Sequence, residues 1–115
     1  MDTYYKECFV ESVYHYKALE NWQKFQIGDI FQLAYDDKYD IVKVENENFC
    51  IGKLSDEDSK SMLPFLKVGW KKLFSSKICL KNDVDSEDKR IKIVIYLVSN
   101  KPKIRKQSQW QSQLQ

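Results

Sequence analysis

Apolar and polar residues alternate along most of this chain, which is the pattern of strands with one buried face. Alternation, or a short continuous apolar run, predicts six strands in total. Their ranges are 4–16, 30–35, 39–45, 49–54, 74–82 and 91–98. The last range, IKIVIYLV, is the most apolar segment and is therefore predicted to be a central strand of a sheet.

A helix is predicted between the fourth and fifth strands. Ser55 is a favourable N-cap residue, and the three acidic residues after it suit the positive end of the helix dipole. Pro64 removes a backbone donor, so we expect a kink or a restart there, and Gly69 suits the C-terminal cap. The inward-facing stripe of the helix is expected to contain Ser59, Met62, Leu63 and Leu66.

The remaining segments predict turns and loops. Residues 17–25 have helical propensity and are interpreted either as one short helical turn or as a covering loop. Residues 83–90 read as a charged loop. Gly52 lies within the fourth strand, where a missing side chain permits a bulge or the close approach of another backbone.

These elements together predict a mainly β fold with one or two short helices. We expect a small half-open antiparallel β-barrel of OB or SH3 type, with the helix between strands four and five. One domain is expected over residues 1–100, followed by a basic, Gln- and Ser-rich tail over 101–115 that is predicted to be flexible. No apolar run approaches the ~20 residues that cross a bilayer, and the N-terminus does not read as a signal peptide. A cytoplasmic protein without a membrane partner is therefore expected.

Charge is distributed unevenly along the chain. Of the 115 residues, 43% are hydrophobic and 14% aromatic, as expected for a packed domain, and the formal net charge is +2. The first 100 residues hold 15 basic and 17 acidic side chains, a formal charge of −2. All four charged residues of the tail are basic: Lys101, Lys103, Arg105 and Lys106. A basic tail on a slightly acidic domain favours a polyanionic partner.

The sequence offers few groups for catalysis or metal binding. Zinc sites usually contain close cysteine pairs, whereas the cysteines here are far apart and the chain has one histidine. A zinc site would need Cys8, Cys50, Cys79 and His15, and buried small side chains in a reducing compartment are the simpler interpretation. A glycine-rich phosphate loop and a G-x-S-x-G turn are both absent.

Two acidic clusters are the other candidates for metal or acid–base chemistry. They contain Asp36, Asp37 and Asp40, and Asp83, Asp85, Glu87 and Asp88. Acidic loops of this kind are usually only solvated. We therefore expect a protein without enzymatic activity, cofactor or metal.

Aromatic and basic residues near the second and third strands form a candidate binding site. Tyr35, Lys38 and Tyr39 flank the turn between these strands, and Lys53 ends the fourth strand. Single-stranded nucleic acids bind to exposed rings, on which bases stack, and to cations beside the phosphates. Spacing alone favours the alternative, in which the tyrosines only cover the open end of the barrel.

The order of motifs along the chain resembles that of a HIRAN domain. That family has a G-D before a strand ending near L-x-R-E-P, an N-P-Y-D turn, an I-G-Y-L or similar segment, a capped helix and a terminal glycine. The resemblance covers roughly residues 7–98. The matching residues are Gly28, Asp29, Leu33, Asp36, Tyr39, Asp40, Val42–Val44, Ile51, Gly52, Leu54, Leu63, Leu66 and Gly69.

The resemblance implies a small OB- or SH3-like barrel that binds DNA, particularly single-stranded 3′ ends, in DNA processing or repair. It makes Tyr39 the ring that stacks on a base, Asp40 an acceptor for the terminal sugar and Lys53 a phosphate contact. Tyr35 stands where the family usually has Arg, and acidic residues 56–58 stand where some members have lysines. Fewer phosphate contacts predict weaker and less salt-dependent binding.

Two other functions are compatible with the same fold. A small barrel also serves as a protein–protein interaction module, here one that docks a partner DNA-processing enzyme. A third option is a metal-dependent nuclease accessory that uses the acidic loop at residues 36–40.

Overall fold

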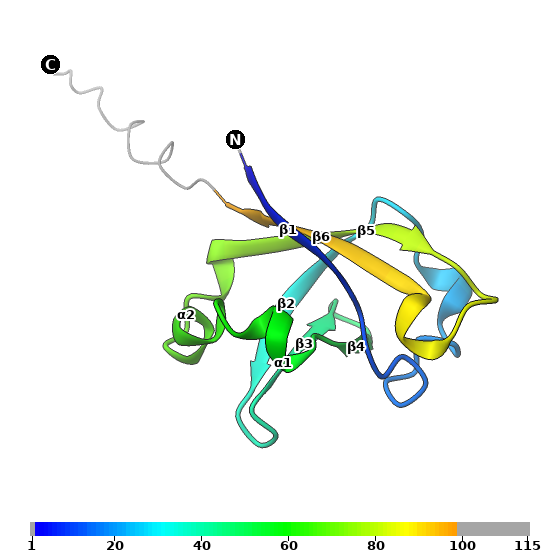
Figure 1. Cartoon of the computed structure of the whole chain (residues 1–115), viewed down its shortest axis with the longest axis horizontal. Helices are drawn as coiled ribbons and strands as arrows, with labels where there is room; N and C mark the ends of the chain where they lie inside the picture. Colours follow the sequence, from blue (N-terminus) through cyan, green and yellow to red (C-terminus); the bar gives the residue numbers. More distant parts are fainter. Residues whose placement is uncertain (1, 99–115) are drawn as a thin grey trace, which may run out of the picture.

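Six antiparallel strands form one sheet in the order β1–β6–β5–β2–β3–β4 (Figure 1). The structure is a computed structural model that describes residues 2–98. The mainly β fold is confirmed, and β6 lies inside the sheet as predicted. The strands are β1 (Thr3–Phe9), β2 (Ile30–Asp36), β3 (Ile41–Glu45), β4 (Cys50–Lys53), β5 (Phe74–Lys81) and β6 (Ile91–Leu97).

The predicted helix between the fourth and fifth strands is present as two short helices. They are α1 (Asp56–Ser59) and α2 (Leu63–Lys67). The second helix begins at Leu63 with Pro64 in its first turn, which confirms the predicted restart. The Ser55 hydroxyl accepts the N–H of Asp58 at 3.0 Å, which confirms the N-cap. Ser59, Met62 and Leu66 are buried and Leu63 is half-buried, so the predicted inward stripe is also confirmed.

Three single 3-10 turns complete the elements: η1 (Trp22–Lys24), η2 (Lys71–Leu73) and η3 (Glu87–Lys89). The short helical turn predicted within residues 17–25 corresponds to η1. The charged segment 83–90 is a loop that contains η3. Within residues 2–98, no helix is long and apolar enough to cross a membrane. The predicted tail, residues 101–115, lies outside the described residues.

The predicted first strand, 4–16, is wrong beyond Phe9. Val10 still donates its N–H to Ile91 at 2.8 Å, but Glu11 leaves β6 and exchanges two backbone hydrogen bonds with Lys53 of β4. At Ser12 the backbone adopts a φ of 60°, which ends the extended conformation, and turns continue from there to η1. The alternation of apolar and polar residues continues past Ser12, because Val13 is buried although it lies in a turn. The sequence pattern therefore does not mark the end of the strand.

The sheet curves strongly without closing into a complete barrel. In Figure 1, β1, β6 and β5 lie across the top, β2 descends from them, and β3 and β4 lie below. Within the described residues, the two edge strands are linked only through the Glu11–Lys53 bridge. The half-open, antiparallel form of the prediction is thereby confirmed.

Gly52 allows the chain after β1 to cross β4. A Cβ atom at this position would lie 2.4 Å from Cγ1 of Val10 and 2.5 Å from the carbonyl oxygen of Glu11. No side chain fits at such distances, so the close backbone approach that the sequence predicted at Gly52 is confirmed.

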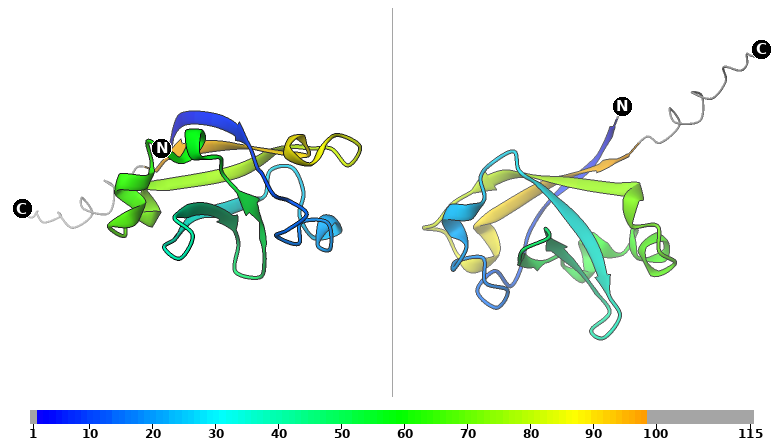
Figure 2. Two further views of the ribbon diagram at one scale, coloured as in Figure 1. Left: turned by 60° about the horizontal axis from the view of Figure 1, so that its bottom comes forward. Right: turned by 180° about the vertical axis from the view of Figure 1, so that it is seen from behind.

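The hydrophobic core lies between the two halves of the curved sheet. Alternate residues of β6 and β3 contribute fully buried side chains, as expected for strands with one inner face. They are Ile91, Ile93, Ile95, Val42 and Val44. Packing of this core leaves the β2–β3 hairpin projecting away from the β1–β6–β5 layer, as both views in Figure 2 show.

Candidate functional site

The turn between β2 and β3 brings together four of the five predicted site residues. β2 ends at Asp36 and β3 begins at Ile41, so the predicted start of the third strand at Tyr39 is two residues too early. Asp40 closes the turn with a φ of 56°, in the left-handed region that Asp tolerates better than most residues. Asp36 shapes the turn because its carboxylate accepts the N–H of Lys38 at 3.0 Å.

Tyr39 presents an exposed ring at the tip of this hairpin. Its side chain is 62% exposed, and Nζ of Lys38 lies 5.3 Å from the ring centroid. In residues 2–98, Lys38 takes part in none of the ion pairs, so its charge remains available to an anion. An exposed ring beside an unpaired cation is the arrangement that a stacked nucleotide needs.

Asp40 is held in place from two sides. The Tyr35 hydroxyl donates a hydrogen bond to Oδ1 of Asp40 at 2.8 Å, and Nζ of Lys67 from α2 lies 3.5 Å from the same oxygen. The hydrogen bond from Tyr35, followed by the charge of Lys67, lowers the pKa of the Asp40 carboxyl below its ordinary value. The same bond is the main cause of the raised pKa of the Tyr35 phenol.

Tyr35 supports the turn rather than presenting a stacking face. Its ring is half-buried and packs against the core, with Nζ of Lys67 5.8 Å from the ring centroid. Its hydroxyl is already committed to Asp40. Tyr35 projects from the inner face of β2, and from there its hydroxyl holds the carboxylate of Asp40 in place.

Lys53 is not brought to the hairpin tip. It lies on β4, level with Lys43 of β3 and, through Lys43, with Ala34 of β2. Its ammonium group is 3.4 Å from the carboxylate of Glu11. The structure therefore places Lys53 on the outer face of the hairpin strands, away from Tyr39, with its charge paired.

The positive charge of Lys43, the other lysine on this outer face, is also paired with carboxylates. Nζ of Lys43 lies 3.7 Å from Asp36 and 3.8 Å from Glu45. These pairs are partly exposed, so each contributes little to stability, but they reduce the positive potential over β3 and β4.

Two residues near the site carried no signal in the sequence. Lys67 reaches Asp40 only because α2 packs beside β2. Tyr16 lies close to the outer face: burial first, and then the nearby thiol of Cys50, raises the pKa of its phenol, with Asp36 and Tyr39 adding to the rise. Both contacts join segments that are distant in sequence, so spacing does not reveal them.

The metal-binding candidates do not converge. Within residues 2–98, no three His, Cys, Asp or Glu side chains are arranged to hold a metal ion. In the second acidic cluster, Asp88 accepts the N–H of Ser12 at 3.3 Å and Glu87 that of Tyr14 at 3.2 Å, which fastens the turn after β1. The three cysteines form no disulfide, and burial raises the pKa of Cys8 to about 12.

Comparison of the chain with protein-family models, with curated proteins and with solved structures gave no match in any of the three. The resemblance to HIRAN domains therefore stays a prediction from the order of the motifs.

Proposed function

We propose that this protein is a non-catalytic nucleic-acid-binding module that binds single-stranded DNA, most favourably at 3′ ends. The observation that carries the proposal is the exposed ring of Tyr39, with Lys38 above it and Asp40 fixed beside it. The order of HIRAN-like motifs supports the same ligand. Within this proposal the protein acts in DNA processing or repair, without a cofactor.

In the proposed complex, the terminal base stacks on Tyr39 and Lys38 approaches a phosphate. Both contacts to Asp40 use Oδ1, so Oδ2 is left to accept a hydrogen bond from the terminal sugar hydroxyl. Asp40 is ionised at neutral pH, and its lowered pKa extends the ionised form to more acidic pH. An ionised carboxylate is a strong hydrogen-bond acceptor. A blocked or phosphorylated 3′ end would remove the donor or bring a like charge.

The paired lysines on the outer face argue for modest affinity. Lys43 and Lys53 must exchange carboxylate partners for phosphates before they contribute. The proposed site therefore depends on stacking more than on charge.

Titration of a labelled single strand tests the proposal. Tyr39→Ala should weaken binding by about 1–3 kcal/mol, the value of one base–aromatic stack, and should abolish the preference for a free 3′ end. Tyr4→Ala is the matched control, because Tyr4 is 58% exposed on the edge strand β1 and its loss should change nothing. If wild type binds no single strand at low salt, the proposal fails.

The second candidate is a protein–protein interaction module that docks a DNA-processing enzyme. It is favoured by an apolar patch on and after α2, where Phe65, Val68 and Trp70 are 40%, 68% and 57% exposed. Val68→Ser should leave DNA affinity unchanged if DNA binds at Tyr39. A cytoplasmic location is part of either proposal, because the three thiols suit a reducing compartment.

A further inference from the structure

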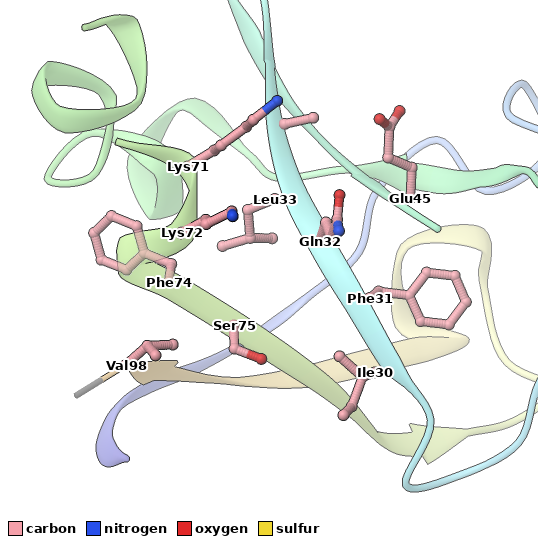
Figure 3. Close-up of a pocket in the computed structure, with 11 residues that line it drawn as sticks. Ile30, Phe31, Gln32, Leu33, Glu45, Lys71, Lys72, Phe74, Ser75 and Val98 are labelled. Atoms are coloured by element: carbon pink, nitrogen blue, oxygen red, sulfur yellow. The ribbon is translucent and has the colours of Figure 1, made fainter. Parts of the chain in front are cut away.

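A groove opens where β2 and β5 separate. The two strands pair only at Ile30–Lys77 and Phe31–Ser76. Beyond that point they diverge, and Figure 3 shows the widening gap between them. The groove has a volume of about 480 Å³, which is within the range of small-molecule sites.

The lining of this groove combines apolar walls with a polar rim. Ile30, which is 62% exposed, supplies apolar surface together with Ala34 and Val98, and Gln32 and Ser75 add an amide and a hydroxyl. A nucleobase needs both features, an apolar surface for its ring and polar groups for its edges. The remaining lining residues are Phe31, Leu33, Glu45, Lys71, Lys72 and Phe74.

Two lysines of η2 stand at the wide end of the groove. In Figure 3 the side chains of Lys71 and Lys72 are directed from η2 toward β2. Both are exposed, and within residues 2–98 neither takes part in an ion pair. Glu45, the one carboxylate in the lining, is already paired with Lys43. The rim is therefore positive although the domain as a whole is slightly acidic.

The groove and the proposed DNA site share the β2–β3 hairpin. Ala34, a lining residue, is the direct cross-strand neighbour of Lys43, and Gln32 is that of Glu45. The outer face of the β2–β3 hairpin therefore leads from the groove to the turn that carries Tyr39. A strand bound at Tyr39 can follow this face without crossing the core.

We propose that this groove holds a second nucleotide of the same single strand, with its base against the apolar walls and its phosphates at Lys71 and Lys72. The inference rests on the proposed function and adds to it a path along which the strand leaves Tyr39. It also explains how a domain with a formal charge of −2 retains a polyanion: the lysines along this path that lack a carboxylate partner, Lys38, Lys71 and Lys72, lie at its two ends.

Two kinds of variant of the full chain test the groove by titration with a labelled oligothymidylate. K71A/K72A should lower affinity about tenfold and reduce the slope of log affinity against log salt by about 1.4, since each phosphate contact contributes about 0.7 for a single strand. K24A/K60A is the matched control, because it removes the same charge from two exposed lysines elsewhere. Ser75→Phe fills the groove without changing the charge and should also weaken binding.

The outcomes separate the groove from the site at Tyr39. If Tyr39→Ala weakens binding as predicted while K71A/K72A behaves like K24A/K60A and Ser75→Phe like wild type, the groove inference is overturned and the proposed function stands. If wild type binds no strand at low salt, both are overturned. Thermal unfolding confirms that each variant is folded. Should Ser75→Phe not fold, the comparison of the two lysine pairs decides alone, because all four lysines are exposed.

Discussion

At the scale of single residues, the proposed site depends on how Asp40 is held. The sequence pointed to Tyr35, Lys38 and Tyr39 as aromatic and basic residues beside a turn, and the order of motifs added Asp40. The structure brings these four residues together around that turn. Their separate roles were not predictable. A tyrosine near a turn is exposed or packed against the core according to the face of the strand from which it projects. Its exposure also depends on which part of β2 is covered by α2.

Removal of the Tyr35 hydroxyl should raise the pKa of Asp40. The hydrogen bond from Tyr35 is the largest cause of the lowered value, so Tyr35→Phe should return the pKa toward 3.8, with Lys67 retaining part of the shift. An NMR titration of the Asp40 carboxyl measures the change, and Tyr96→Phe on β6 is the control. An Asp40 pKa that does not move in Tyr35→Phe would contradict the assignment of this bond.

The sign of the accompanying pH effect follows from the direction of the shift. A carboxyl whose folded pKa lies below its unfolded value stabilises the folded state above the unfolded pKa. That contribution disappears as the pH falls through the lowered pKa. In Tyr35→Phe the remaining contribution of Asp40 should therefore be smaller and should disappear at a higher pH than in wild type.

At the scale of elements, local signals were reliable where local interactions determine the structure. Ser55, Pro64 and Gly69 act through the backbone within one or two turns, so the boundaries and the break of the helix were readable. The first strand was misjudged because its end depends on a distant contact. Glu11 leaves β6 for Lys53, a partner 42 residues away, and no local alternation signals that exchange.

Gly52 permits this exchange, so its substitution should destabilise the fold. In Gly52→Ala the added Cβ would collide with Val10 and Glu11, and overpacking of this kind typically costs about 1–3 kcal/mol. The free energy of unfolding from denaturant titration measures the loss. Gly28→Ala is the control, because Gly28 has a φ of 98° but no atom within 4 Å of the added carbon. A loss in Gly52→Ala no larger than in Gly28→Ala would argue against the crossing.

At the scale of the whole molecule, the sequence predicted the architecture better than the charge distribution. Strand number, helix placement and the half-open sheet follow from periodicity and short connections. Which lysines stay unpaired depends on tertiary contacts. Lys53, predicted as a phosphate contact, is paired with Glu11. Lys71 and Lys72 were not predicted as site residues, yet they line a groove.

NMR observation of the Tyr39 ring during addition of a short single-stranded DNA tests the central claim most directly. Stacking of a base on this ring should shift its proton resonances upfield, with accompanying shifts at Lys38 and Asp40. The ring of Tyr4, which is similarly exposed, should not respond. Tyr39 resonances that remain unchanged at saturating DNA and low salt would contradict the account.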